Sequence, residues 1–389
     1  MEQSSDAARP PFVYWTCLWA AGLAFASVAV AYDIFRPDLI TPPGRDFSNL
    51  YTGGKLALEG RAYLAFDLDS FRLALREFVG TLTRQNYSYP PHALFIAVPF
   101  ALLPYGVSFA LWSALSLGVF YWAAKPYVRF APVLSVLTPA AALNLWNGHY
   151  GLMLGASWLL FFQLLEKRPF AAGLVASVMT FKPHMGLFIG LASLSKWRTV
   201  LGAIAGIIGL VALSVWAFDP AGWYGFVGQT LSAQTEILAR SDNEFYFRMM
   251  PSAFTAYGRE GFAVGVQLVV AVAALVMLYR YRRIDPFVLA TATFLVVPYV
   301  FVYDMTVACL GFAIIIWRDW AELRKWEKWA LTAAFLLPVI ALGINRVGTM
   351  FGPPILLAAL FIQIRRSTGE AASWPQRQPK TSAAPRAAA

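Results

Sequence analysis

Residues 200–218 read VLGAIAGIIGLVALSVWAF, a run without a single charged side chain. A helix of about 20 apolar residues is long enough to cross the hydrocarbon core of a bilayer. Other runs that match or approach this length are Val13–Ala31, Tyr105–Ala124, Phe262–Tyr281 and Trp329–Leu342. The sequence therefore predicts an all-α polytopic membrane protein.

The composition agrees with this fold class. The 389 residues are 59% hydrophobic and 13% charged, whereas about a quarter of the residues in an ordinary soluble domain are charged. The net charge of +10 could indicate a nucleic-acid partner. However, the Lys and Arg residues stand in short clusters between apolar runs, which is the positive-inside pattern, and no nucleic acid is expected. Cys17 and Cys309 lie in apolar segments, so neither a disulfide framework nor a zinc site is predicted.

The basic clusters fix a topology if all of them face the cytoplasm. Residues 36–91 and 219–260 then become the first and second large extracytoplasmic loops, and most of the unusual polar residues fall on that side of the membrane. The clusters are Lys125 with Arg129, Lys167 with Arg168, Lys196 with Arg198, Arg280 with Arg282 and Arg283, Arg318–Lys328, and Arg365 with Arg366.

Two apolar segments are too short to cross the membrane. Residues 92–103 and 170–181 would each form a helix of about 18 Å, against a core of about 30 Å. We expect the second to pair with residues 185–195 as a hairpin with Lys182 at its tip. The first is either a half-span or a sign that Lys125 lies on the other side. The prediction is a single domain, residues 1–366, with about 11–13 transmembrane helices.

The sequences of the two chain ends predict a retained first span and a disordered tail. Residues 1–12 contain Glu2 and Asp6 against Arg9, so the basic region of a signal peptide is missing and the first span is expected to be a retained anchor. Residues 367–389 are rich in Ala, Pro and Ser, which predicts a disordered cytoplasmic tail.

The first loop begins with PPGRDFSNLYTGGK, residues 42–55. A helix starting near Ser48 would put Tyr51 and Lys55 on one face, and residues 49–59 and 66–79 are both expected to form amphipathic helices at the membrane surface. Asp46 is either the cap of that helix or a general base at the water–membrane boundary, where partial desolvation raises the proton affinity of a carboxylate. The spacing does not decide between these readings.

Further candidates lie at the ends of apolar runs. Tyr89 and His92, in YSYPPH (87–92), are interface anchors or line a sugar-binding pocket. Asn147 and His149 lie in the polar turn NLWNGHY (144–150). Lys182 is followed by Pro183 and His184. A charged side chain in an apolar stretch costs free energy, so Lys182 should face a cavity, form an ion pair or snorkel to the interface. A functional Lys182 would contact a phosphate.

The remaining candidates come later in the chain. Arg240 and Arg248 in the second loop are either solvated or hold a phosphate. Asp304 and Asn345-Arg346 are turn residues at the bilayer surface or walls of the same cavity. No H-E-x-x-H or C-x-x-C motif is present. No cofactor or metal site is predicted, and a divalent cation held by carboxylates is left open.

Several short motifs follow one another between about residues 44 and 200. They are Asp46-Phe47 with Tyr51, Gly60 with Tyr63, Tyr89-Pro90-Pro91, Leu102-Leu103-Pro104, Trp112, Asn147-Gly148-His149, Ala172-Gly173-Leu174 and Lys182-Pro183. Their order resembles glycosyltransferase family 87, of the GT-C superfamily, and His149 stands where that family usually has Gln.

The resemblance implies a GT-C-like bundle and a membrane glycosyltransferase. Its donor would be a polyprenyl-phosphate sugar, by family default mannose, and its acceptor a glycolipid, glycan or protein. Asp46 would be the general base of an inverting displacement, with Lys182 and an arginine of the second loop at the phosphate. The resemblance further implies a bacterial inner membrane with the site facing the periplasm.

A transporter or lipid flippase is the main alternative. Such proteins place ionisable residues near mid-span, often in broken or repeated helices. Here most span centres carry no charge and no two-fold repeat is visible, although the segment around Lys182 would suit a transporter. A scaffold role leaves the one-sided polar residues unexplained.

Overall fold

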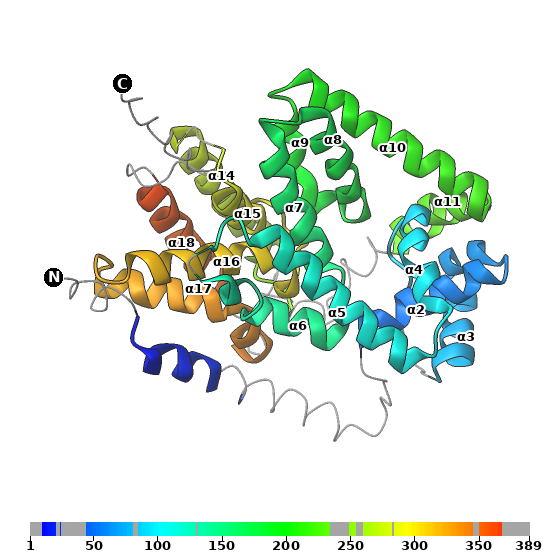
Figure 1. Cartoon of the computed structure of the whole chain (residues 1–389), viewed down its shortest axis with the longest axis horizontal. Coiled ribbons are helices and arrows are strands. Elements are labelled where there is room, and N and C mark those ends of the chain that lie inside the picture. The colour runs from blue at the N-terminus through cyan, green and yellow to red at the C-terminus, as the bar shows by residue number, and fades with distance from the viewer. Residues whose placement is uncertain are drawn as a thin grey trace, which may run out of the picture.

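The computed structural model describes residues 10–20, 24, 44–80, 85–129, 131–233, 249–253, 260–281, 284–344 and 350–367. Every regular element in these ranges is helical. Figure 1 shows the helices of residues 260–367 gathered at one end of the molecule and those of residues 45–101 at the other, with the helices of residues 105–165 between them and those of residues 169–218 along one side. The predicted all-α fold class is confirmed.

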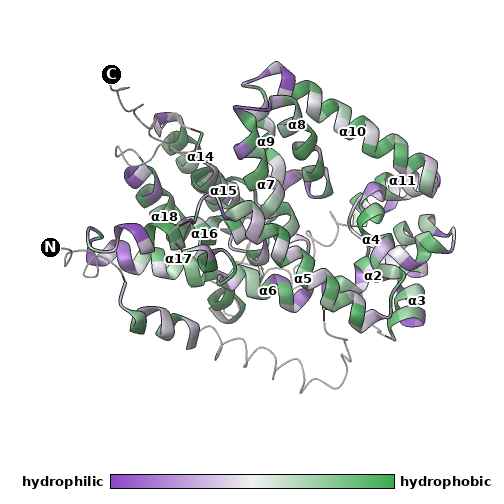
Figure 2. Ribbon diagram, in the orientation of Figure 1, coloured by the Kyte–Doolittle hydropathy of each residue, from purple (hydrophilic) through white to green (hydrophobic). Residues whose placement is uncertain are grey.

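Three helices among the described residues are long and apolar enough to cross a membrane. They are α5 (Tyr105–Ala124), α10 (Trp197–Phe218) and residues Gly261–Tyr281 of α14 (Glu260–Tyr281). Only 11% of the apolar window of α10 is buried inside the protein, and Figure 2 shows hydrophobic residues along its whole length. An outward apolar surface of this length needs lipid around it, so the chain is a polytopic membrane protein. The count of 11–13 spans stays a prediction.

The short apolar segments are helices of partial membrane depth. Helix η3 (Pro91–Ala93) leads into α4 (Leu94–Ala101), and α8 (Pro169–Ser177) continues as η5 (Val178–Phe181). After Lys182 the chain enters η6 (Pro183–Gly186) and returns through α9 (Leu187–Ser193). The predicted hairpin with Lys182 at its tip is therefore confirmed.

The first loop contains α2 (Arg45–Leu58), η2 (Ala62–Phe66) and α3 (Leu68–Val79). Both expected helices form, and α2 begins at Arg45, three residues before the predicted start. Helix α2 packs closely on α4, because a Cβ on Gly54 would lie 2.7 Å from the carbonyl oxygen of Ala97. Most side chains of α2 are buried, so this helix is part of the protein interior, and the expectation that it lies at the membrane surface is wrong.

The other elements complete the frame of the site. Asp219 accepts a hydrogen bond from the backbone of Ala221 at 2.8 Å at the start of α11 (Ala221–Gly225). Helix η7 (Phe226–Thr230) is a π-helix. The remaining elements are η4 (Pro132–Ser135), α6 (Pro139–Asn147), α7 (Gly151–Leu165), α15 (Pro286–Val296), η9 (Val302–Asp304), α16 (Thr306–Asp319), α17 (Lys325–Ile344) and α18 (Gly352–Ser367).

Candidate functional site

A cavity of about 320 Å³ lies where α2, the segment before η3, the α6–α7 turn, the Lys182 hairpin, η7 and η9 meet. This volume is within the range of small-molecule binding sites. The sequence-predicted residues that line it are Asp46, Tyr89, Asn147, His149, Lys182 and His184. Residues from four separate parts of the sequence thus come together in one place.

Four predicted residues in the described ranges do not line this cavity: Asp304, which pairs with Lys182 beside it, and Tyr51, Lys55 and His92. The Tyr51 hydroxyl donates to the carbonyl oxygen of Leu103 at 3.0 Å. The Lys55 ammonium lies 5.5 Å from the Tyr51 ring centroid, which confirms that the two share a helix face. His92 is buried, with its Nε2 atom 2.9 Å from the Thr180 hydroxyl. Arg240, Arg248 and Asn345-Arg346 lie outside the described residues.

Asp46 lies in the first turn of α2 and lines the cavity. The cap position belongs to Gly44, with φ of 78°, and no side chain caps the helix. The reading of Asp46 as the helix cap is therefore wrong. In the part of the chain that the structure describes, no group donates a hydrogen bond to its carboxylate. Desolvation raises the pKa of Asp46 to about 6, although Arg45 and Lys182 favour the charged form.

The turn between α6 and α7 is held against α2. Gly148 has φ of 66°, and a Cβ there would lie 2.4 Å from the Cβ of Phe47. Glycine meets both requirements, the left-handed backbone and the close approach. The indole N–H of Trp112 donates to the Gly148 carbonyl at 3.0 Å. This turn thus fixes Asp46, next to Phe47, relative to His149.

His149 is held in one tautomer. The backbone N–H of Gly151 donates to His149 Nδ1 at 3.1 Å, so this nitrogen carries no hydrogen. Burial lowers the pKa of His149 well below its ordinary value, and the ring is neutral. Its Nε2–H group then donates to the Tyr89 hydroxyl oxygen at 2.9 Å. The hydroxyl hydrogen of Tyr89 has no acceptor among the described residues and is left for a group in the cavity.

Lys182 and Asp304 form a buried ion pair. The Lys182 ammonium lies 2.9 Å from Asp304 Oδ2 and 3.1 Å from Oδ1. It also lies over the Tyr303 ring, 5.1 Å from its centroid. Both residues are 7% exposed, so the snorkelling reading of Lys182 is wrong. Burial raises the pKa of the Asp304 carboxyl, and Lys182 opposes this shift.

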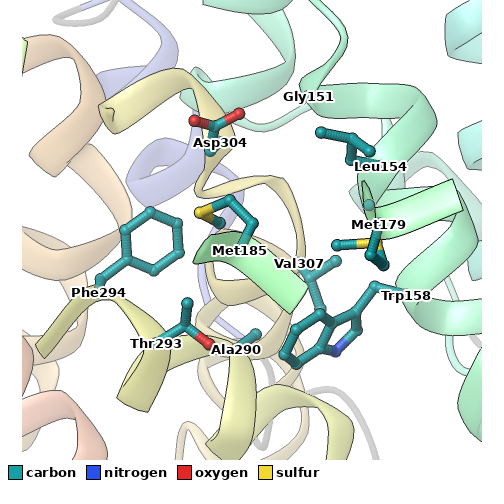
Figure 3. Close-up of a pocket in the computed structure, with 11 residues that line it drawn as sticks. Gly151, Leu154, Trp158, Met179, Met185, Ala290, Thr293, Phe294, Asp304 and Val307 are labelled. Atoms are coloured by element: carbon teal, nitrogen blue, oxygen red, sulfur yellow. The ribbon is translucent and has the colours of Figure 1, made fainter. Parts of the chain in front are cut away.

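A second, much smaller cavity lies on the apolar side of Asp304. Figure 3 shows Met179, Met185, Trp158 and Phe294 around it, with Asp304 at its edge. Its volume of about 20 Å³ holds about one water molecule. Asp304 thus separates a cavity of substrate size from a packed apolar interior.

The sequence missed several residues of the larger cavity. Arg45, Asn49, Gln85 and Asn86 line it. Asn49 follows Asp46 by three positions on one helix, and this spacing could have revealed it. Gln85 and Asn86 carry no local signal. Across the described ranges, no group of three or more His, Cys, Asp or Glu side chains is arranged to hold a metal ion.

Comparisons with known proteins give one family. The model of glycosyltransferase family 87 matches residues 87–303, which is more than half of the chain. No curated protein and no solved structure matches. The matched range contains Tyr89, His149 and Lys182 and extends beyond the predicted resemblance to η9, whereas Asp46 precedes it.

Proposed function

The chain belongs to glycosyltransferase family 87, and on this basis we propose that it moves a sugar from a polyprenyl-phosphate donor to a hydroxyl group of a glycolipid or glycan. We propose mannose as the sugar and the 320 Å³ cavity as the active site. The transporter or flippase alternative is set aside, because membership of this family makes the chain a glycosyltransferase.

The observation that carries the proposal is the state of Asp46. This carboxylate lines the cavity, has no hydrogen-bond donor among the described residues, and has its pKa raised to about 6 by desolvation. A general base works best when its pKa lies near the working pH. Asp46 would take the proton of the acceptor hydroxyl as the oxygen attacks the anomeric carbon. The bond from that carbon to the phosphate oxygen breaks, the electron pair leaves with the polyprenyl phosphate, and the configuration inverts.

Two other groups suit the departing phosphate. The Tyr89 hydroxyl has a hydrogen to donate, because its oxygen accepts from His149. Lys182 contributes an ammonium whose charge Asp304 balances, so the pair would hold the phosphate by hydrogen bonding without trapping the product. Hydrogen-bond donors that are already positioned where charge develops in the transition state contribute strongly to rate enhancement in enzymes. The predicted arginine of the second loop remains part of this proposal.

A lipid-linked donor suits the position of the cavity. Phe226, Leu231 and Met249 give the cavity an apolar part. Phe226 lies in the π-helix η7, which directly follows α11 and the lipid-facing span α10. A polyprenyl tail would remain beside α10 while the phosphate reaches Lys182 and Tyr89 in the cavity. With the basic clusters in the cytoplasm, the cavity would face the periplasm of a bacterial inner membrane.

The test is sugar transfer by purified protein in lipid nanodiscs. The donor is polyprenyl-phosphate β-mannose carrying a radiolabel, and the variants are Asp46→Asn and Asp69→Asn. Asp69 lies in the same loop with a side chain that is 92% exposed. We expect transfer into an α-linked product by the wild type and by Asp69→Asn. Loss of the base should lower the rate about 10²- to 10⁴-fold in Asp46→Asn, whereas equal rates would remove Asp46 from catalysis.

A further inference from the structure

Four side-chain amides line the cavity that Asp46 lines. Asn147 donates from Nδ2 to the Leu143 carbonyl oxygen at 2.9 Å, and the other three amides are buried. Asn49, Gln85 and Asn86 are 9%, 4% and 6% exposed, respectively. Each has one buried polar atom without a hydrogen-bond partner: Asn49 Oδ1, Gln85 Nε2 and Asn86 Nδ2. An unpaired buried polar atom costs about 1–3 kcal/mol. Three of them together on one wall indicate that a ligand normally supplies the partners.

The amide wall, which is Asn49, Gln85 and Asn86, is held in place by its surroundings. Gln85 is hydrogen-bonded to the Ser48 hydroxyl at 3.0 Å. Tyr87, which follows Asn86, is fully buried and packs so closely on α2 that a Cβ on Gly53 would lie 2.7 Å from its ring. These contacts fix the amides before any ligand arrives, which lowers the entropic cost of binding.

The chemistry of the wall favours a sugar. An amide group offers a donor and an acceptor, and each sugar hydroxyl likewise donates and accepts. A phosphate only accepts, and the neighbouring Asp46 carboxylate would repel it. A lipid chain makes no hydrogen bonds at all. A group with several hydroxyls therefore satisfies this wall best.

The position of the amide wall favours binding of the acceptor substrate over binding of the donor substrate. Asn49 lies one turn after Asp46 on α2, so a sugar held by the amides would present a hydroxyl to that carboxylate. Lys182 comes from another element of the cavity, the hairpin tip, and it suits the donor phosphate. We propose that Asn49, Gln85 and Asn86 form the acceptor subsite, and that the acceptor group beside Asp46 is a sugar residue, not a serine or threonine side chain or a lipid alcohol. This inference rests on the proposed function.

The experiment compares Asn49→Ala and Asn86→Ala with the wild type and with Gln229→Ala, an exposed amide that does not line the cavity. Two rates are measured with the labelled donor: transfer to octyl α-mannoside and hydrolysis, which is transfer to water. We expect a rise of about 5- to 50-fold in the acceptor KM of each variant, since one or two hydrogen bonds are lost. Donor KM and hydrolysis should stay within about twofold. The melting temperature should change little, because each substitution removes a buried polar atom that has no partner in the folded protein.

Two results of the transfer assay would overturn the inference. The first is wild-type transfer to octanol or to a threonine-containing peptide as fast as to octyl α-mannoside. The second is an equal loss of hydrolysis and transfer in the variants, which would assign the amides to the donor or to the fold.

A binding measurement separates this inference from the proposed function. Saturation-transfer NMR with methyl α-mannoside needs no turnover. If the wild type neither transfers nor hydrolyses the donor, the proposed function fails, yet binding that is lost in Asn49→Ala and Asn86→Ala and kept in Gln229→Ala would still support a sugar subsite. Absence of binding to the wild type would overturn it.

Discussion

Asp46 and Asp304 both lie at the candidate site, but their carboxylates have different partners. Asp304 accepts two hydrogen bonds from Lys182, and its Oδ1 atom lies 3.7 Å from His149 Nδ1. Asp46 lines the larger cavity and has no hydrogen-bond donor among the described residues. Desolvation raises the pKa of both carboxyls, that of Asp46 to about 6, and at Asp304 the hydrogen-bonded Lys182 opposes the shift. The carboxylate of Asp304 is thus held by a partner, whereas that of Asp46 faces the cavity and would accept a proton from a bound group.

The difference follows from which neighbours each residue has. Asp304 comes from η9, a break between α15 and α16, which lies against the tip of the Lys182 hairpin. Asp46 comes from a helix whose nearest charged neighbour in the chain is Arg45. Burial of a charge is tolerated when a partner and hydrogen bonds accompany it. Where they are missing, the carboxylate takes up a proton more readily.

The largest effect is expected when the paired carboxylate loses its charge. Asp304→Asn leaves the Lys182 ammonium buried without a counter-ion, which should lower the free energy of unfolding by about 3–5 kcal/mol. SDS titration of the purified protein measures this loss. Asp319→Asn, which breaks the more exposed pair with Arg318, should cost less than about 1 kcal/mol. A Lys182→Met/Asp304→Asn double variant that is no more stable than Asp304→Asn would contradict the pairing argument.

The second-largest loss of stability is expected from substitution of Gly148, which holds the α6–α7 turn against α2. Gly148→Ala forces a left-handed backbone on alanine and pushes its Cβ against Phe47. We expect a loss of about 2–4 kcal/mol in the free energy of unfolding, together with slower transfer as Asp46 moves. Gly60→Ala is the matched control, because Gly60 has φ of 71° and nothing within 4 Å of the added Cβ. Equal losses in both variants would rule out the contact with Phe47.

Asp46→Asn should stabilise the fold while it lowers the transfer rate. A pKa raised by about two units means that the charged carboxylate costs the folded state at most about 3 kcal/mol. The cost is present in full above about pH 6, falls as the pH drops from 6 towards 4, and vanishes below the unfolded pKa near 4. The melting temperature of the variant should therefore exceed that of the wild type at pH 8 and equal it at pH 4. A variant less stable at pH 8 would show that Asp46 has partners in the fold.

The smallest effect is expected away from the cavity. Lys55→Met removes a charge beside Tyr51, and Lys55 does not line the cavity. Transfer should remain within about twofold of the wild-type rate in the nanodisc assay. A tenfold loss of the transfer rate would show that the face of α2 that carries Lys55 also belongs to the site, and that Asp46 is not the only residue of this helix on which transfer depends.

The sequence predicted what depends on local pattern. Run lengths predicted the fold class and the partial-depth segments. The cost of a lysine in an apolar stretch limited Lys182 to a cavity, an ion pair or the membrane interface, and did not decide among them. The partner of Lys182 could not be identified, because Asp304 lies 122 positions away and no periodicity connects them. Gln85 and Asn86 were missed for the same reason, since their role arises when the chain folds back against Ser48 and α2.

The most direct test of Asp46 as the base is the pH dependence of kcat/KM for transfer by the wild type between about pH 4.5 and 8.5. The base must be deprotonated, so the rate should fall as the pH drops through an apparent pKa of about 6. The residual rate of Asp46→Asn should lack this step. A wild-type profile that stays flat down to pH 4.5, or the same step retained in Asp46→Asn, would contradict the assignment of Asp46 as the base.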